Sequence, residues 1–326
     1  FSQEFLLASP GGDPVDFLAG VYFQTADLTS DQITPVRFTG LPPVDAGVRA
    51  QIDAALGTNL QAGDIDADWF AFFDQDTTSI SSFGELTFNL RDDFRIVTGL
   101  RCSKDEKEVS KSRFQSQAGS TTPDPFLAAV YGPILQLSGT YAYTLERDED
   151  HVTCNVGLQW NPNADSMLYL NVSSGYKAGG FDEDNALGSL DNAEFEDETV
   201  RGVEAGGKFT VLDGRGRINA ALFHAKYEDL QVSTFDGNAS FVVGNAAESV
   251  VTGLEADWTF AVTEHLILSG ALALLNAEYD SFPDSACTSM QIVAWVAAGN
   301  PRATCTQDLS GRPLQFAPEW AANIAA

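Results

Sequence analysis

Carboxylates between residues 181 and 198 form the densest group of side chains in this sequence that could do chemistry together. The group holds Asp182, Glu183 and Asp184, followed by Glu194, Glu196, Asp197 and Glu198. Clustered carboxylate oxygens are ligands for Ca²⁺, so Asp182, Glu183 and Asp184 are candidate metal ligands. A solvated acidic loop has the same composition, and the D-x-[DN]-x-[DN]-G pattern of calcium loops is absent from the sequence.

The four cysteines, Cys102, Cys154, Cys287 and Cys305, are dispersed and show no C-x-x-C spacing for zinc or redox work. Cys287 and Cys305 bracket one loop-like stretch, and we expect a disulfide between them, which requires an oxidising compartment. Two free thiols are the alternative. We expect Cys102 and Cys154 to remain free thiols.

Catalytic patterns are missing. The sequence holds no G-x-S-x-G elbow, no G-x-x-x-x-G-K-[ST] loop and no H-E-x-x-H pair. His151, His224 and His265 lie in separate predicted strands or turns without paired spacing. We therefore expect no catalytic residues, no resident cofactor and no enzyme.

Composition narrows the class of protein further. The 326 residues carry 46 Asp and Glu against 18 Lys and Arg, a net charge of −28. A nucleic-acid binder needs a basic face, so that class is excluded. With 44% hydrophobic residues the chain is expected to fold. The longest apolar run, residues 266–277, falls short of the ~18 residues of a membrane helix.

Strict alternation of apolar and polar residues, the mark of a strand with two unlike faces, recurs along the chain. Val152, Cys154, Val156, Leu158 and Trp160 alternate with Thr153, Asn155, Gly157, Gln159 and Asn161, and residues 94–101, 168–173, 203–211 and 254–260 behave likewise. The polar positions carry both signs of charge: Glu85, Asn89, Arg95, Arg101, Asn155, Gln159, Asn171, Glu204, Lys208, Glu255 and Asp257.

Short and long connections alternate between these strands. The short ones carry turn residues, as in the stretches 91–93, 161–165 and 212–216. The long ones cover about 28–68, 110–136, 181–197 and 281–315, with a shorter one near 236–240. Long strands with short turns at one end and long loops at the other are typical of a transmembrane β-barrel. A soluble β-sandwich also alternates, but it has shorter strands and no reason to segregate its loops.

We therefore predict an all-β, antiparallel transmembrane β-barrel with long extracellular loops and short periplasmic turns. About eleven strands are expected, over 2–8, 15–27, 69–91, 94–109, 137–160, 166–180, 198–211, 216–235, 241–260, 265–280 and 316–326. Two loop segments, 43–57 and 288–298, have helical periodicity. Each is expected to be a short helix that caps its own loop, or else the wall of a binding vestibule.

Several segments together resemble the barrel of TonB-dependent outer-membrane receptors. The resemblance rests on residues 175–181, on the stretch 195–208, and on later segments around 219–231, 243–247, 253–256 and 316–320. The positions that carry it are Gly175, Tyr176, Lys177, Gly179, Gly180, Phe181, Glu198, Glu204, Gly253 and Glu255. Residues 1–4 and 7–10 fit the same family, whereas 28–68 and 110–136 have no counterpart in it.

The resemblance implies a 22-stranded barrel in the outer membrane of a Gram-negative bacterium, of which residues 1–326 form about half. The N-terminal plug domain and the C-terminal strands are expected to be absent from this chain. The family takes up scarce ligands with energy from the TonB–ExbB–ExbD complex, so the implied partners are that complex, outer-membrane lipid and a small ligand. The mixed charges of the polar face suit contact with a plug.

The family's commonest cargo, an iron–siderophore complex, is the expected ligand. Cobalamin and oligosaccharides are alternatives within the same family. A passive porin and a soluble β-rich binding domain are alternatives outside it.

Overall fold

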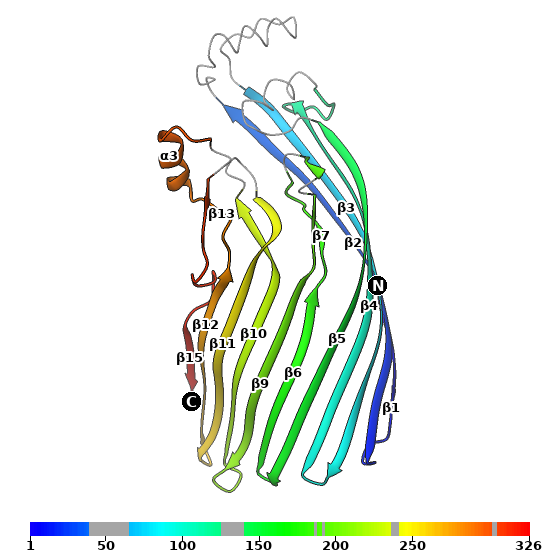
Figure 1. Cartoon of the computed structure of the whole chain (residues 1–326), viewed down its shortest axis with the longest axis vertical. Helices are drawn as coiled ribbons and strands as arrows, with labels where there is room; N and C mark the ends of the chain where they lie inside the picture. Colours follow the sequence, from blue (N-terminus) through cyan, green and yellow to red (C-terminus); the bar gives the residue numbers. More distant parts are fainter. Residues whose placement is uncertain (39–64, 125–139, 186–187, 191–192, 236–240, 302–304) are drawn as a thin grey trace, which may run out of the picture.

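The chain, in a computed structural model, forms one curved antiparallel sheet of 11 strands (Figure 1). The structure describes residues 1–326 except 39–64, 125–139, 186–187, 191–192, 236–240 and 302–304. In sheet order the strands are β1 (Ser2–Ala8), β2 (Val15–Phe38), β3 (Ile65–Arg91), β4 (Phe94–Gln117), β5 (Tyr141–Asn163), β6 (Ser166–Lys177), β9 (Glu198–Val211), β10 (Gly216–Phe235), β11 (Phe241–Thr263), β12 (Leu266–Ser281) and β15 (Trp320–Ala325).

Three smaller elements lie in the connections. β7 (Gly180–Phe181) pairs with β8 (Glu194–Phe195) in the connection between β6 and β9. β13 (Ser285–Ala286) pairs with β14 (Thr306–Gln307), and the helix α3 (Ser289–Ala297) lies between them. The predicted helix over 288–298 is confirmed, and Thr288 caps it through the Gln291 backbone N–H. The helix predicted over 43–57 lies outside the described residues.

One face of the sheet carries the exposed apolar side chains, and we call it the outer face. Leu100, Val152, Val156 and Leu222 project from it with exposed fractions between 47% and 67%. Alternation puts the polar residues of the same strands on the opposite, inner face, as expected for a sheet whose apolar side meets lipid. Among the described residues no helix is long and apolar enough to cross a membrane.

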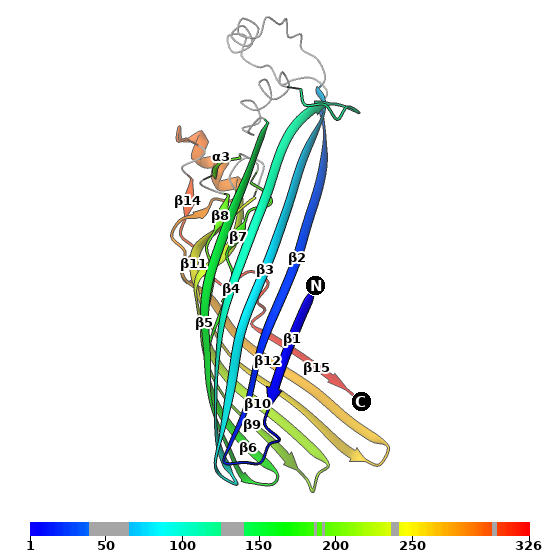
Figure 2. The ribbon, with the colours of Figure 1, turned by 90° about the vertical axis from the view of Figure 1, so that its right-hand side faces the viewer.

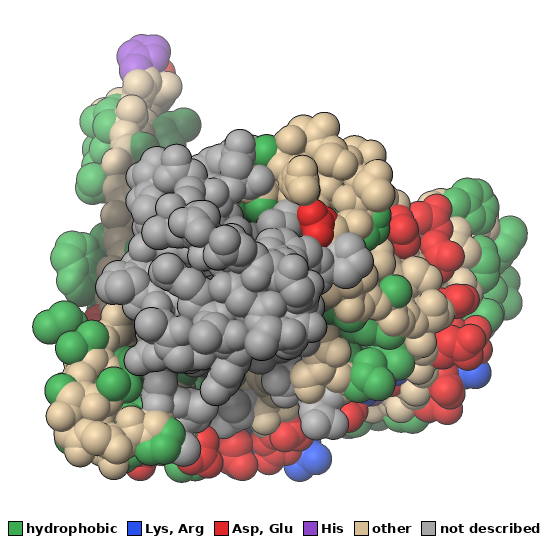
Figure 3. All heavy atoms as spheres, turned by 90° about the horizontal axis from the view of Figure 1, so that it is seen from above, with side chains coloured by type: hydrophobic (Ala, Val, Ile, Leu, Met, Phe, Trp, Pro, Cys, Tyr) green, Lys and Arg blue, Asp and Glu red, His purple; other side chains and the backbone are tan. Residues whose placement is uncertain are grey.

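The connections are segregated to the two ends of the sheet. In Figures 1 and 2 the tight turns after β3, β5, β9 and β11 lie at the lower end, and the described parts of the long connections after β6 and β12 lie at the upper end. The turn after β9 needs positive φ at Leu212, Asp213 and Gly214. Seen from the upper end, Asp and Glu side chains predominate over Lys and Arg along the visible rim (Figure 3).

Several strands extend well beyond the length that crosses a membrane, ~9–11 residues. β2, β3 and β4 have 24, 27 and 24 residues. The prediction of loops over 28–68 and 110–136 is therefore wrong at 28–38, 65–68 and 110–117, which are strand. In these parts outward positions such as Asp31 and Ser110 are polar, so the regular apolar alternation that identified the lower halves is lost.

Other strand limits shift by a few residues. The strand predicted from 137 begins at Tyr141, the strand predicted to 180 ends at Lys177, and the strand predicted over 316–326 covers Trp320–Ala325. The eleven predicted strands and their order are otherwise confirmed.

Candidate functional site

The connection between β6 and β9 (residues 178–197) folds back onto the inner face of the upper sheet instead of extending outward. Phe181 is buried against Phe73 of β3 and Val109 of β4, and Leu145 of β5 packs against the same cluster. The Glu183 carboxylate accepts hydrogen bonds from Ser30 and Gln32 of β2. The connection therefore lines the inner wall from β5 across to β2.

Glycine is required where this connection meets the wall. A Cβ on Gly179 would lie 2.5 Å from Glu149 Oε1 and 2.5 Å from the Phe195 carbonyl oxygen, closer than any side chain tolerates. The Gly179 N–H donates to the Glu149 carboxylate over 3.0 Å. This packing explains the residues of the family segment 175–181. Gly179 lets the connection approach the wall closely, and Phe181 anchors it in an apolar cluster.

Segments that are far apart in the sequence fasten the connection on its other side. The Gln231 side chain of β10 donates to the carbonyl oxygens of Lys177, Ala178 and Glu196. The Asn245 side chain of β11 donates to the Glu196 and Asp197 carbonyl oxygens, and the Glu196 N–H donates back to Asn245. Glu198 accepts from the Gln231 N–H over 3.0 Å.

Arg147 of β5 is the centre of charge in this junction. Its guanidinium pairs with Glu149 and Glu196 and lies 3.6 Å from a carboxylate oxygen of Glu194. Burial opposes the positive charge, but the bonds to Glu196 and Glu149 outweigh it, so the pKa of Arg147 is raised. The same guanidinium lowers the pKa of the Glu196 carboxyl. Sequence reasoning did not single out Arg147.

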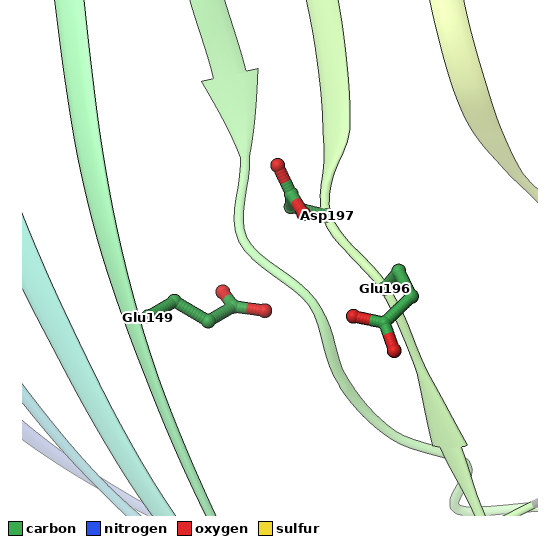
Figure 4. Close-up of side chains that lie close together, drawn as sticks. All are labelled: Glu149, Glu196 and Asp197. Carbon is green, nitrogen blue, oxygen red and sulfur yellow. The ribbon is translucent and has the colours of Figure 1, made fainter.

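Three carboxylates of this junction, Glu149, Glu196 and Asp197, bring ligand oxygens within 4.8 Å of one another. Figure 4 shows them converging from β5 and from the segment before β9. The His151 ring adjoins the group, 3.4 Å from Glu149 and 3.7 Å from Asp197. Oxygen and imidazole ligands suit a divalent metal. Arg147 already balances Glu149 and Glu196, however, so a cation would have to displace that guanidinium.

The predicted metal ligands Asp182, Glu183 and Asp184 lie in the same connection with other partners. Asp182 is buried and accepts from the backbone N–H groups of Asp184 and Val243. Burial raises the pKa of the Asp182 carboxyl. Glu183 reaches β2, as described above. A metal at these three residues stays a prediction.

Two lysines of β4 face this connection from the wall. Lys107 donates to the Gly179 carbonyl oxygen, and Lys111 donates to the Asp182 carbonyl oxygen over 3.0 Å and to that of Glu183. Burial lowers the pKa of Lys107, and it lowers the pKa of Lys111 to about 8. Neither lysine forms an ion pair with a described residue, but carboxylates lie near both: Glu149 and Asp105 near Lys107, and Asp182, Asp184 and Glu183 near Lys111.

Tyrosines extend the wall upward. Tyr141 and Tyr143 stack with ring centroids 5.8 Å apart, and the Tyr141 hydroxyl donates to the Asn185 carbonyl oxygen. Burial raises the pKa of Tyr141 to about 12, so it is a neutral phenol at any physiological pH.

Lower on the inner face a second concavity of about 550 Å³ lies among β6, β9, β10, β11, β12 and β15. Its lining includes Glu204, Lys208, Asn219, Glu255 and Asp257, which are polar residues predicted for this face, apart from Asn219. The Tyr169 hydroxyl donates to Glu204, and Asn219 donates to Asp257 over 2.8 Å. Gly253 lies beside it, where a Cβ would meet the Phe223 ring.

The cysteines and remaining histidines lie apart from both sites. Cys287 and Cys305 form a disulfide around α3, with Cα atoms 5.7 Å apart. Cys102 and Cys154 are free and exposed on the outer face. His224 is also on the outer face, and His265 lies at the turn before β12.

Comparison with known proteins identifies the family. A family model described as "TonB dependent receptor-like, beta-barrel" matches residues 8–326. The chain belongs to this family. As a TonB-dependent receptor barrel it lies in the outer membrane, and the resemblance seen in the sequence is confirmed.

Solved structures of such receptors share the fold. The ferric yersiniabactin uptake receptor FyuA of Yersinia pestis superposes with a TM-score of 0.67 at 16% identity, covering 99% of this chain and 38% of FyuA. The siderophore receptor PiuA of Acinetobacter baumannii gives a TM-score of 0.63 at 18% identity, covering 99% of this chain and 43% of PiuA.

In sequence, the metal-pseudopaline receptor CntO of Pseudomonas aeruginosa is 30% identical over 126 residues. That match covers 39% of this chain and 17% of CntO. This chain therefore spans well under half the length of the receptors it resembles.

Proposed function

We propose that this chain is part of a receptor that imports a metal–siderophore complex across the outer membrane. Iron is the expected metal. TonB–ExbB–ExbD would supply the energy, acting through a plug domain elsewhere in the full-length protein. Family membership supports the transport class, and the 30% identity with a receptor named for a metal-pseudopaline complex supports a chelated metal as cargo.

The observation that carries the proposal is the cationic wall beneath the β6–β9 connection. Lys107 and Lys111 donate to backbone carbonyl oxygens and not to carboxylates, so their positive charges are not neutralised by an ion pair with a described residue. Such charges contribute to the attraction of an anionic ligand in a partly desolvated wall, and the nearby carboxylates of Glu149 and Asp182 offset part of that attraction. Metal chelates that present carboxylate or catecholate oxygens have the matching charge.

The aromatic residues above this wall fit the same ligand class. Tyr141 and Tyr143 contribute aromatic rings to the wall, which suit the organic part of a chelate. An uncharged oligosaccharide would gain from the aromatic faces and nothing from the lysines. A passive porin would need neither the aromatic faces nor the lysine charges.

Growth of a deletion strain tests the cargo. The strain should lose growth on one defined metal–siderophore source and regain it with the receptor supplied on a plasmid, provided TonB is present. Growth defects on cobalamin or on an oligosaccharide instead would assign another cargo of the family. Uptake that persists without TonB would identify a passive channel and contradict the proposal.

Variants of the two wall lysines test whether these side chains contact the cargo. Lys107→Gln with Lys111→Gln should weaken uptake at limiting chelate by about a hundredfold or more, since each of the two charge-assisted bonds contributes ~1.5–3 kcal/mol. Lys104→Gln is the matched control, because Lys104 lies on the outer face of the same strand, paired with Glu106. Equal loss in both variants would mean that the wall does not contact cargo.

A further inference from the structure

The upper part of β5 has an edge without a neighbouring strand, although β5 lies inside the sheet. β5 pairs with β4 as far up as Tyr141 without a register shift, but its pairing with β6 ends at Asn155 and Ser173. Figure 1 shows β5 diverging from β6 above this height. The connection after β6 turns to the inner face, and none of its described residues forms a backbone hydrogen bond with β5.

The contacts of Cys154 show which backbone groups of β5 point to this edge. The Cys154 N–H donates to the Ser174 hydroxyl over 3.0 Å, and that hydroxyl donates to the Cys154 carbonyl oxygen over 3.4 Å. Successive residues of a strand direct their backbone groups to opposite edges, so every second residue above Cys154 points the same way. These residues are Val152, Asp150, Asp148, Glu146, Thr144 and Ala142. Among the described residues nothing pairs with their backbone N–H and C=O groups.

A free edge of this kind can take up another strand. Its N–H and C=O groups are spaced as in a β-ladder, and an extended peptide pairs with them over several residues. Natural sheets protect such edges with proline, lysine or a bulge. Residues 141–153 contain no proline and no lysine, and their pairing with β4 has no bulge. The edge is therefore open to backbone pairing.

The outward side chains beside the edge specify the charge of an added strand. Glu146, Asp148 and Asp150 are exposed and follow one another at every second position. Glu106 of β4 lies behind them, in register with Asp148. Opposite charges in direct cross-strand positions stabilise a sheet, and like charges destabilise it. An added strand therefore needs basic side chains at its outward positions.

The inner side of the same edge is apolar in its upper part. Leu145 packs against the buried cluster around Phe181, and Tyr143 stacks with Tyr141. The inward side chains of an added strand would lie beside these residues. Apolar side chains fit there because they extend a surface that is already apolar.

We propose that the upper edge of β5 binds an extended cationic peptide, a segment of a polypeptide outside the cell, as an additional strand. The peptide backbone pairs with residues 142–150. Its lysine or arginine side chains alternate with apolar ones, so that the basic groups lie beside Glu146, Asp148 and Asp150. This surface is separate from Lys107 and Lys111, which lie on the inner face of β4.

The test uses the receptor expressed from its natural reading frame and purified in a neutral detergent. Three labelled eight-residue peptides serve as probes, and fluorescence anisotropy measures their affinity. One alternates lysine and valine, and the second alternates glutamate and valine. The third is the lysine–valine peptide N-methylated at its lysines, which removes the N–H groups that would face the edge.

Two variants alter the edge, and a third is the matched control. E146K/D148K reverses two charges beside the edge, and T144P removes one edge N–H without changing the charge. D27K/D31K makes the same charge change as E146K/D148K on the outward face of β2, three strands away. Heat-modifiable migration on gels confirms that each barrel is folded.

The lysine–valine peptide should bind the unaltered receptor and D27K/D31K alike, and it should protect the amides of residues 142–150 from hydrogen exchange. E146K/D148K should bind it about tenfold more weakly, because two attractions become repulsions, and T144P should bind it about threefold more weakly or worse.

Several results would each overturn the proposal. These are no binding of the lysine–valine peptide, equal binding of the glutamate–valine or the N-methylated peptide, unchanged affinity in E146K/D148K or in a folded T144P, and an equal loss in D27K/D31K. The outcome does not depend on which cargo the receptor imports.

Discussion

The imidazole ring of His151 stacks on the phenol ring of Tyr176, with ring centroids 3.6 Å apart and planes 18° from parallel. The backbone ladder between β5 and β6 ends below this contact, at Asn155 and Ser173. The Tyr176 hydroxyl also donates to Asp105 of β4 over 2.9 Å. Side chains therefore join three strands at the height where backbone pairing between β5 and β6 has stopped.

Removing the ring should loosen the β6–β9 connection. Tyr176→Ala deletes both the stack and the hydrogen bond, and Tyr176→Phe deletes only the bond. We expect local opening to become easier by about 2 kcal/mol in the alanine variant and about 1 kcal/mol in the phenylalanine variant. Hydrogen exchange of the amides in residues 178–185 measures this. Exchange in the alanine variant equal to that of the unaltered protein would refute the role of the stack.

Replacing Arg147 should be the most damaging single change in this junction. The side chains of Arg147 and Glu149 are only 11% and 9% exposed, so Arg147→Gln leaves a buried carboxylate without its partner. Breaking one side of a buried pair costs about 3–5 kcal/mol. Amide exchange in the connection should rise accordingly. Arg147→Lys should restore part of the protection, because it keeps the positive charge, but not all of it, because it lacks the paired N–H donors of the guanidinium.

An exposed pair provides the comparison. Lys104 and Glu106 are 2.6 Å apart, but their side chains are 46% and 56% exposed. Exposed pairs contribute about 0.2–1 kcal/mol. Lys104→Gln should therefore change stability far less than Arg147→Gln. Equal effects would show that burial does not govern these pairs.

Lys111 should make the connection more stable as pH rises. Burial lowers the pKa of Lys111 to about 8, below the ordinary lysine value of 10.5. Below pH 8 the amine is protonated in both the closed and the open states, so it contributes no slope. Between about pH 8 and 10.5 the open state binds more protons, so stability of the closed state rises with pH.

Lys111→Met isolates this contribution. Protection of the amides in residues 178–185, corrected for intrinsic exchange, should increase from pH 8 to pH 10 in the unaltered protein and increase less in the variant, where Lys107, whose pKa is also lowered by burial, still contributes. The range stops at pH 10 because the pKa of Tyr141, raised by burial to about 12, gives the opposite slope above that. A rise of the same size in the variant would assign the pH dependence to another group.

The sequence predicted the lower half of the sheet more accurately than the upper half, and the cause is physical. Where a strand crosses lipid, the outward positions must be apolar, so Val156 and Leu158 alternate visibly with polar neighbours. Above the membrane the outward positions need not be apolar: Asp27 and Asp31 face one side of β2 and Ser30 the other, a pattern that does not differ from that of a loop.

The candidate site was predicted in part for a similar reason. Glycines and aromatics of the family segment, such as Gly179 and Phe181, stand out in a sequence. Arg147 and Lys111 lie among other charged residues in the sequence. Only the folded connection shows that carboxylates surround Arg147 and that backbone carbonyl oxygens surround Lys111. Gln231 and Asn245 lay in segments that resembled the family, but their shared target was not visible.

A ladder of four carboxylates on the outer face should destabilise the upper sheet. Asp27, Asp76, Glu108 and Glu146 lie in direct register on β2, β3, β4 and β5, and all four are exposed. Directly opposed like charges are unfavourable by about 0.2–1 kcal/mol per pair, and Glu108 belongs to two such pairs. Glu108→Lys replaces both repulsions by attractions and should raise the thermal midpoint by a few degrees at low ionic strength. The measurement uses about 10–20 mM salt, where the Debye length is about 20–30 Å and screening is weak.

The salt dependence and a charge-matched control decide whether the ladder is the cause. In about 1 M salt, where the Debye length is ~3 Å, the advantage of Glu108→Lys should largely vanish. Glu264→Lys makes the same charge change in the exposed turn before β12, outside the ladder, and should leave the midpoint nearly unchanged at either salt concentration. A gain in Glu264→Lys as large as in Glu108→Lys would trace the effect to net charge alone and not to the register of these four side chains.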